Sequence, residues 1–460
     1  MEEIVKLPAA ALAKAIRNKA ISATEAVDAY INRIKAVNPK LNAVVQLSEK
    51  TAHDQASKAD KALANGDISG PLHGVPFTIK DSFDTAGLIS TGGTKGRSNH
   101  VPSRDATIVS RLRAAGAILL GKTNTPELTL SYETKNLIYG QTNNPYDLSR
   151  SPGGSSGGAA AIVAVGGSAF DIGSDYGGSL RFPAHCCGIT TIKPTSGRVP
   201  RTGHILPFGG VLDSFQQMGP MARSVDDLSL ILPIIAGPDY IDPGIVSMPL
   251  YDPKDVDLTT LRVAFHSDNG IISPSPETKK VIREAAERLN ACGLIVAEIR
   301  PNGIEQSYDL MMGLLSADGG TSTRRLLQEA GTKEHTLPWL EHAPPLDATG
   351  FDILMMKWYR FRSTMLSFFK KYDVILSPVN AFPAMPHGSF GADLKAFSYT
   401  MTYNMTGWPA AVVRGGTSPN GLPIGVQIIA HPGREDVALA VAAYIEKALD
   451  GFQSASSLDT

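Results

Sequence analysis

The stretch GGSSGG (residues 153–158), followed by GSDYGGSLRFPA (residues 173–184), sets serines in a frame that is dense in glycine. Glycine has no side chain to obstruct a close approach of the backbone, and it tolerates positive φ. A run such as Tyr176, Gly177, Gly178 and Ser179 can therefore turn several N–H groups toward one point, as an oxyanion hole requires. The stretch predicts loops shaped for catalysis more than long regular elements.

A second informative segment, GVPFTIKD (residues 74–81), is an apolar run of strand type that ends on Lys80. A serine and a lysine can act as a nucleophile and its base. A lysine with the ordinary pKa near 10.4 is neutral in only about one molecule in 2,500 at pH 7, a cost of roughly 4.6 kcal/mol. The neighbouring Val75, Phe77 and Ile79 predict a dry surrounding, and burial lowers the pKa of a lysine.

These blocks, in this order, resemble the amidase signature family of serine hydrolases. The resemblance also covers GKTNTPEL (residues 121–128), the stretch YGQTNNPYDLSRSPGGSSGG (residues 139–158) and the closing block WPAAVVRGGTSPNGLPIGVQIIA (residues 408–430). It is close over residues 60–235 and 395–450, whereas the residues between them match only in their alternation of helix and strand patterns.

The resemblance implies an α/β fold class, with a single α/β/α layered domain around a large mixed, mostly parallel β-sheet. The catalytic blocks run from Lys80 to Ser179 and a related block lies near the C-terminus, so no cut through the middle leaves a self-contained piece. We therefore expect one domain over residues 1–460. Its expected parts are an N-terminal helical layer (1–65), a signature core (66–237), a variable substrate-side region (238–390) and a C-terminal return to the core (391–460).

The resemblance also implies roles for individual residues. Ser179 takes the place of the nucleophile, Ser155 that of a bridging serine held by a cis peptide bond, and Lys80 that of the terminal base. The expected oxyanion donors are the backbone N–H groups of Tyr176, Gly177, Gly178 and Ser179. The expected supporting residues, which hold the loops by hydrogen bonds and charge, are Ser156, Ser174, Asp175 and Arg181.

The implied reaction is hydrolysis of linear amides by a free-standing amidase, through an acyl-enzyme at Ser179 and without a cofactor. Esters and carbamates should react as well, because the same tetrahedral geometry and oxyanion donors serve them. The expected partner is a small-molecule substrate, and the expected assembly is a monomer or homodimer. No metal is expected, because the ten histidines form no H-x-x-x-H pair and no cysteine spacing fits zinc.

Composition favours a cytoplasmic protein. The formal net charge is −1 and no stripe of lysine and arginine would follow a phosphate backbone, so nucleic acid is not an expected partner. The apolar run at residues 159–165 is far shorter than a membrane span, and the N-terminus MEEIVKLPAA lacks the charge and apolar core of a secretory signal. Three cysteines, at 186, 187 and 292, predict reduced thiols and no disulfide framework.

The pattern of apolar residues predicts the main elements. The first sixty residues predict a helical layer, with Ser22 and Glu25 as a capping box and Ala26, Ala29, Tyr30 and Ile34 on one face. We further expect strands at 117–120, 261–265 and 374–377, and helices at 159–165, 277–289 and 351–371. The methionines and other large apolar residues of the variable region are expected mainly in the core, and some of them in an apolar substrate pocket.

Three other interpretations of the sequence stay open. Residues 116–123, GAILLGKT, match the P-loop pattern, but the middle residues suit a strand and Pro126 follows where a helix should run. Residues 153–157 match G-x-S-x-G, which would make Ser155 an esterase nucleophile, with His185 or His204 as candidate bases outside the expected late position. The third is a glutaminase subunit of a tRNA-dependent amidotransferase, which is disfavoured because residues 316–331 lack the stretches that accompany glutamine recognition in that branch.

Overall fold

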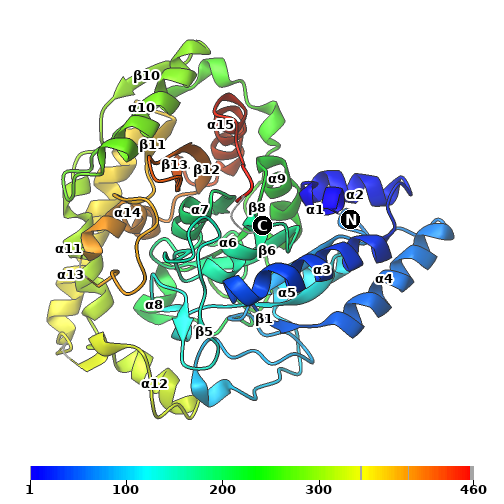
Figure 1. The fold of residues 1–460 in the computed structure, drawn as a ribbon. Coiled ribbons are helices and arrows are strands. Elements are labelled where there is room, and N and C mark those ends of the chain that lie inside the picture. The colour runs from blue at the N-terminus through cyan, green and yellow to red at the C-terminus, as the bar shows by residue number, and fades with distance from the viewer. Residues whose placement is uncertain (1, 342–343, 392, 456–460) are drawn as a thin grey trace.

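The structure, a computed structural model, describes residues 2–341, 344–391 and 393–455. Its largest element is an eight-stranded mixed sheet in the order β10–β9–β11–β13–β12–β7–β8–β6, with helices around it (Figure 1). The strands are β6 (Phe170–Asp175), β7 (Thr190–Lys193), β8 (Gln217–Ala222), β9 (Arg262–Phe265), β10 (Ile295–Glu298), β11 (Val374–Pro378), β12 (Ala410–Thr417) and β13 (Pro423–Ala430). The α/β class and the large mixed sheet are confirmed.

The sheet is not mostly parallel, so that part of the expectation is wrong. Of its seven neighbouring pairs in the described residues, only β10–β9 and β9–β11 run parallel. Strands β6 and β7 are joined through α7 (Arg181–Cys187), and β8 lies between them, antiparallel to both. The closing block adds β12 and β13 as an antiparallel hairpin. The helix α7 lets β6 and β7 run in the same direction, as a helical crossover does. It does not determine that β8 lies between them and runs the opposite way.

The first sixty residues form the expected helical layer, coloured blue in Figure 1. It consists of α1 (Glu2–Lys6), α2 (Ala9–Arg17), α3 (Ala23–Leu41) and α4 (Glu49–Ala64), with the short strand β1 (Val44–Leu47) before α4. The predicted capping box begins α3: the Glu25 N–H donates to Ser22 Oγ at 3.0 Å, and the Ser22 N–H donates to the Glu25 carboxylate at 2.8 Å. The predicted apolar face is buried.

A second, three-stranded sheet carries Lys80. Its order is β1–β3–β2, with β2 (Pro76–Lys80) parallel to β3 (Ile118–Thr123). Strand β2 lies against β6, because the Thr78 hydroxyl donates to the Asp171 carboxylate at 2.6 Å and Phe77 stacks on Phe170 with ring centroids 5.2 Å apart. The two strands therefore lie beside each other, which brings Lys80, the last residue of β2, close to Ser174 in β6. Because residues 118–123 form a buried strand, the P-loop interpretation is wrong.

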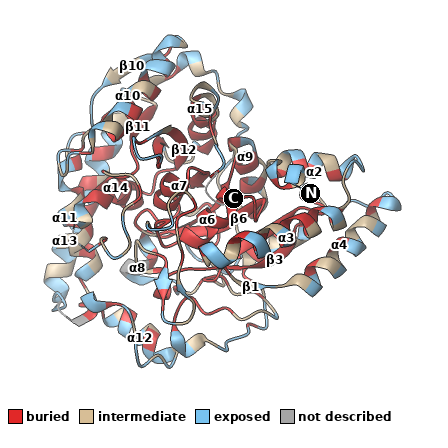
Figure 2. Ribbon diagram, viewed as in Figure 1, coloured by how far each residue is buried: buried red, intermediate tan, exposed pale blue. Residues whose placement is uncertain are grey.

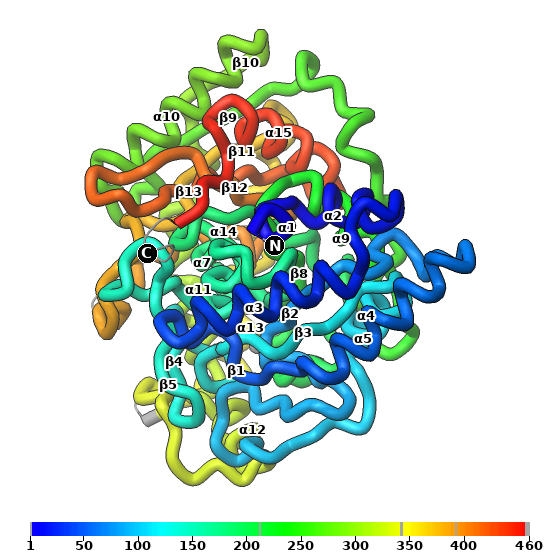
Figure 3. Tube along the Cα trace, turned by 45° about the vertical axis from the view of Figure 1, so that its right-hand side comes forward, coloured from blue at the N-terminus to red at the C-terminus, as the bar shows by residue number. Residues whose placement is uncertain are grey.

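The centre of the molecule is the buried helix α6 (Gly157–Ala164), which begins at the GGSSGG turn as expected (Figure 2). Its small residues permit close packing: a Cβ on Gly158 would lie 2.5 Å from the Asn124 backbone nitrogen. Figure 3 shows the C-terminal segment, in orange and red, beside the green middle of the chain, because β12 pairs with β7. Residues far apart in sequence thus meet around α6 and α7.

The variable region (residues 238–390) contributes a further group of helices. The expected helices there correspond to α10 (Pro276–Ala291) and α13 (Ala348–Leu366), and between them lie α11 (Ser307–Ser316) and α12 (Thr321–Glu329). Residues 317–341, here called the α12 arm, contact the signature core through a small apolar cluster of Leu128, Leu327, Leu337 and Leu340. The other elements are α5 (Thr107–Ala114), α8 (Gly210–Ser214), α9 (Val225–Ile235), α14 (Ser398–Thr406), α15 (Glu435–Ala448), β4 (Lys135–Asn136) and β5 (Gly140–Gln141).

Among the described helices, none has both the length and the apolar character that crossing a bilayer requires.

Candidate active site

Lys80 stands at the end of β2 with its amine among three serine hydroxyls. Its Nζ lies 2.6 Å from Ser155 Oγ, 3.0 Å from Ser156 Oγ and 2.9 Å from Ser174 Oγ. Ser155 and Ser156 come from the turn before α6, and Ser174 comes from β6. Three segments that are separate in the sequence therefore deliver the predicted lysine and three of the predicted serines to one point.

The surroundings of Lys80 disfavour its charged form. Its side chain is fully buried, and Val75, Phe77 and Ile79 are buried beside it as the sequence predicts. Burial lowers the pKa of Lys80 well below its ordinary value, and the charges of Asp175 and Asp171 oppose this shift without reversing it. The hydroxyl groups around the amine can donate or accept a hydrogen bond, so they serve a neutral amine as well as an ammonium.

The two serine loops are joined to each other. The peptide bond between Gly154 and Ser155 is cis, as the resemblance implies. The N–H of Ser156 donates to the Ser179 carbonyl at 3.2 Å, and the Ser156 hydroxyl donates to the Ser174 carbonyl at 3.3 Å. These two bonds fix the bridging serine relative to the loop that carries Ser179.

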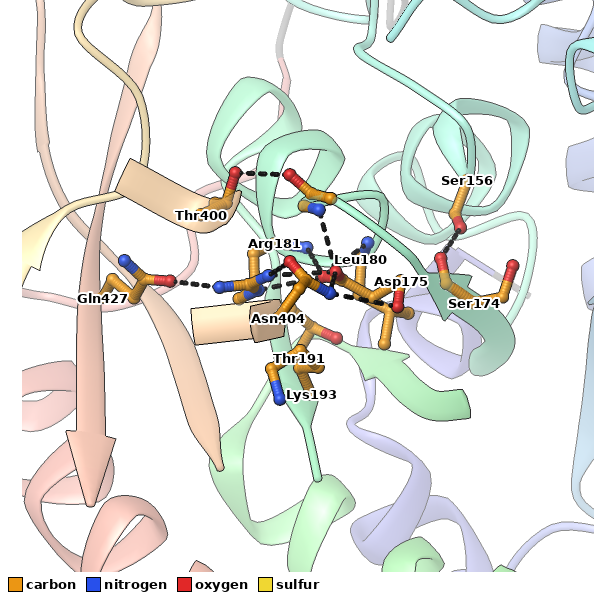
Figure 4. A network of polar contacts seen from close by, with 12 residues as sticks. Ser156, Ser174, Asp175, Leu180, Arg181, Thr191, Lys193, Thr400, Asn404 and Gln427 are labelled. Carbon is orange, nitrogen blue, oxygen red and sulfur yellow. Dashed lines mark hydrogen bonds and ion pairs between the residues drawn. The ribbon is translucent and has the colours of Figure 1, made fainter. Parts of the chain in front are cut away.

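The loop after β6 is anchored by a buried ion pair between Asp175 and Arg181 (Figure 4). The guanidinium donates to both carboxylate oxygens at 2.9 Å, and neither side chain is exposed. Although burial alone would raise it, the charge and hydrogen bonds of Arg181 hold the pKa of Asp175 below its usual range. The Asp175 carboxylate also accepts from the Leu180 N–H at 3.1 Å. The predicted supporting residues therefore lie where they can hold this loop.

The four expected oxyanion donors divide into two groups. The Gly178 N–H donates to the Asp175 carboxylate at 2.8 Å, whereas the N–H groups of Tyr176, Gly177 and Ser179 have no acceptor among the described residues. The Gly177 carbonyl accepts from the hydroxyls of Tyr132 at 3.0 Å and Thr400 at 2.7 Å. The C=O and N–H of a trans peptide point in opposite directions, so these bonds turn the Gly178 N–H toward Asp175. In this structure the Gly178 N–H is therefore engaged by Asp175, while the other three expected donors have no acceptor among the described residues.

Ser179 lines an apolar cavity of about 650 Å³. Its hydroxyl has no hydrogen bond to Ser155 or Lys80 among the contacts of the described residues, so only the first link of the expected relay, from Lys80 to Ser155, is closed. The walls come from the signature core, α11, the α12 arm and residues 390–401. They include Tyr132, Tyr176, Met312, Leu315, Leu337, Trp339, Phe390 and Met401. Met312 and Leu315 are thus pocket residues, while Met311 and Leu314 are in the core.

Sequence reasoning missed two side chains that complete the anchor. Asn404 of α14 donates to the Asp175 carboxylate at 2.8 Å and accepts from Arg181 at 2.5 Å. Gln427 of β13 accepts from Arg181 at 2.6 Å (Figure 4). Gln427 lies within the closing block that carries the family resemblance, so the sequence held a signal for it. Asn404 precedes that block, and no motif points to it.

The two histidines that the esterase interpretation offers as bases do not contact Ser155. His185 contacts the Phe382 carbonyl at 3.0 Å and the Gly425 N–H at 2.9 Å, and His204 contacts Ser174 at 3.2 Å. Neither imidazole is hydrogen-bonded to Ser155, whose hydroxyl contacts Lys80. In the part of the chain that the structure describes, no group of three or more His, Cys, Asp or Glu side chains could hold a metal ion.

Comparison with known proteins identifies the family. The model of the Amidase family matches residues 25–439. An acylamidase of Rhodococcus erythropolis is 35% identical over 459 residues, which cover 96% of this chain and 95% of that protein. A glutamyl-tRNA(Gln) amidotransferase subunit from Roseiflexus sp. is 34% identical over 95% of both chains. The solved structure of 6-aminohexanoate cyclic dimer hydrolase superimposes with a TM-score of 0.89, at 29% identity over 99% of both chains.

The family match covers all the segments that build the site, from β2 to β13. The chain belongs to the amidase signature family and is a hydrolase that cleaves amides.

Proposed function

We propose that this enzyme cleaves amides through an acyl-enzyme at Ser179, with Ser155 passing the proton between Ser179 and Lys80. The observation that carries the proposal is the buried amine of Lys80, 2.6 Å from the Ser155 hydroxyl and surrounded by hydroxyl groups. A neutral amine in this position can accept a proton from Ser155, because its lone pair is free when its hydrogens bond to Ser156 and Ser174.

Acylation begins when Ser179 Oγ attacks the substrate carbonyl. The proton of Ser179 passes to Ser155, and the proton of Ser155 passes to Lys80, which becomes an ammonium. The Ser155–Ser179 contact has to close for this step, as catalytic hydrogen bonds often do only when the substrate is bound. The negative charge of the tetrahedral intermediate falls on the carbonyl oxygen, for which the N–H groups of Tyr176, Gly177 and Ser179 are available as donors.

Collapse of the intermediate breaks the C–N bond. The ammonium of Lys80 returns its proton through Ser155 to the departing nitrogen, so the amine leaves in neutral form. A water molecule then repeats the sequence in the second half-reaction: it loses a proton through Ser155 to Lys80, attacks the acyl carbonyl, and Ser179 is released with a proton from the same relay. Esters and carbamates follow the same steps, and a carbamate gives a carbamoyl-enzyme.

The cavity supports a substrate with an apolar or aryl acyl group. Apolar and aromatic side chains, among them Met312 and Trp339, form most of its wall, and burial of apolar surface is the main source of affinity in such a pocket. Several of the hydroxyls on the wall are already bonded to the protein: Tyr132 donates to Gly177, and Thr336 donates to the Glu127 carboxylate at 3.0 Å. These two groups add little polar recognition, whereas the buried Tyr176 hydroxyl has no hydrogen-bond partner among the described residues.

The test is a hydrolysis panel of anilides, primary amides, aryl carbamates and nitrophenyl esters, combined with labelling by an activated phosphonate. Ser179→Ala should abolish turnover of every class and remove the label, while Ser149→Ala, at an exposed loop, should leave both unchanged. Labelling that persists in Ser179→Ala would assign the nucleophile elsewhere, first to Ser155.

The similarity to the amidotransferase subunit favours a second candidate, a glutaminase that works within a larger complex. The apolar wall of the cavity argues for the free-standing amidase, because glutamine is small and polar. Turnover of anilides by the purified chain alone would support the amidase. Release of ammonia from glutamine only in the presence of partner subunits would support the glutaminase.

A further inference from the structure

His204 is a buried histidine that contacts the Lys80 cluster, and the reaction as proposed above gives it no role. Its ring Nε2 lies 3.2 Å from Ser174 Oγ, the same oxygen that Lys80 contacts at 2.9 Å. The segment that carries His204 pairs with the residues after β2. The Ile205 N–H donates to the Ser82 carbonyl at 2.9 Å, and the Phe83 ring meets the imidazole edge-on at 5.0 Å. The imidazole is therefore held in place beside the catalytic lysine.

The neighbours of His204 determine which nitrogen carries the hydrogen. The backbone N–H of Leu206 points to Nδ1 at 3.3 Å, and the Gln216 side-chain amide lies 3.0 Å from the same nitrogen. A backbone N–H can only donate, so Nδ1 is the acceptor and Nε2 carries the hydrogen of the neutral ring. Burial, together with the charges of Lys80, Arg201 and Lys122, lowers the pKa of His204 well below its ordinary value. The ring is neutral and donates to Ser174.

This donation works against an ammonium at Lys80. An ammonium has three hydrogens, and its three acceptors here are the hydroxyl oxygens of Ser155, Ser156 and Ser174. When His204 already donates to Ser174, that oxygen is a poorer acceptor for Lys80, and the positive end of the N–H bond faces the cluster. The neutral amine, whose two hydrogens bond to Ser156 and Ser174, is disfavoured less, because it carries no net charge for that positive end to repel. The carboxylates of Asp175 and Asp171 act in the opposite sense.

We propose that His204 is a positioning residue for this reaction, which donates its Nε2 hydrogen to Ser174 and thereby keeps Lys80 in the neutral form that accepts a proton. The proposal rests on the proposed role of Lys80 as base. It makes a specific prediction, because removal of the donor should remove this repulsion and favour the ammonium.

The test compares the pH dependence of kcat/KM, and of Ser179 labelling by an activated phosphonate, in the wild type and in His204 variants. In His204→Leu the acidic limb should move to higher pH by about one unit, so that activity at a pH on that limb falls roughly tenfold and recovers at higher pH. His204→Gln can still present an N–H near the Nε2 position, so its limb should stay near that of the wild type. His266→Leu, at a buried histidine that makes no hydrogen bond to the Lys80 cluster among the described residues, is the matched control.

Recovery at high pH separates this effect from a general structural defect, which would lower activity at every pH. If His204→Leu does not fold, His204→Asn, which is too short to reach Ser174, replaces it. The proposal is overturned if the limb stays in place in the leucine or asparagine variant, or if the glutamine variant moves as far as they do. If Ser179→Ala keeps its label, the proposed function fails instead, whatever the His204 variants do.

Discussion

Lys80 and Lys122 are two buried lysines of the same small sheet with different surroundings. Lys122 of β3 is paired with Ile79 of β2, so its side chain lies on the face opposite to that of Lys80. Its amine donates to the Phe83 carbonyl and to the Thr85 hydroxyl at 2.8 Å, and it lies 4.0 Å from the Asp81 carboxylate. The amine of Lys80 contacts hydroxyl groups only, among the described residues.

The difference shows that burial alone does not make a base. Burial lowers the pKa of Lys122 to about 8, with the charge of Asp81 opposing the shift, and the carbonyl that it contacts can only accept hydrogen bonds. This surrounding suits a structural cation. At Lys80 burial is equally complete, but the contacts can donate as well as accept, so the neutral amine is accommodated. The two lysines therefore differ in their hydrogen-bond partners and not in how deeply they are buried.

The first prediction tests whether this difference is functional, and it carries the largest effect. Lys80→Met should lower kcat for an anilide by about 10³-fold or more, since among the described residues only Lys80 is placed to take the proton from Ser155. The loss for an activated nitrophenyl ester should be smaller, because its leaving group needs no proton. Lys122→Met is the matched control, whose folded fraction should retain kcat. Equal losses for amide and ester in Lys80→Met would contradict the base assignment.

The second prediction concerns stability at the same two sites. Lys122→Met should lower the free energy of unfolding by about 3 kcal/mol, because it leaves the buried Asp81 carboxylate without its nearest cation. Lys80→Met should cost little or stabilise the protein, since the buried amine is already disfavoured as an ion. Denaturant unfolding of both variants at pH 7 measures the contrast. A Lys80→Met variant that is the less stable of the two would reverse the comparison.

The third prediction concerns pH. The folded pKa of Lys80 is below its unfolded value, so kcat/KM should fall as pH falls through that lowered pKa and stay high above it. Lys122 titrates on the other face and should give no limb in the activity profile. Its folded pKa of about 8 also lies below the unfolded value near 10.5, so its contribution to stability should rise with pH across that window. Activity profiles and unfolding free energies between pH 6 and 10 test both statements.

The fourth prediction applies to a region without charge and carries the smallest effect. Met312→Ala enlarges the cavity beside Ser179 and should change the ratio of kcat/KM between a bulky and a small acyl group by roughly tenfold in favour of the bulky one. Met356→Ala, on the exposed face of α13, is the control and should leave the ratio unchanged. An unchanged ratio in both variants would place the acyl group elsewhere.

Much of this protein follows from local sequence. The glycine blocks, the apolar run before Lys80 and the capping box at Ser22 specify backbone shapes through nearest-neighbour sterics and short hydrogen bonds, so those elements and the burial of Lys80 were predicted in place. The family resemblance added the grouping of Lys80 with Ser155, because several blocks occur together in order.

The tertiary structure alone decided the rest. Strand direction within the large sheet depends on which strand fills the gap between β6 and β7, and no local pattern encodes that choice. The Gly178 N–H turns to Asp175 because hydroxyls of Tyr132 and Thr400, which are distant in sequence, hold the preceding carbonyl. Asn404, Gln427 and His204 reach the site by the same kind of long-range packing. Sequence determines what each segment can form, whereas hydrogen bonds between segments determine which of their groups remain free to act.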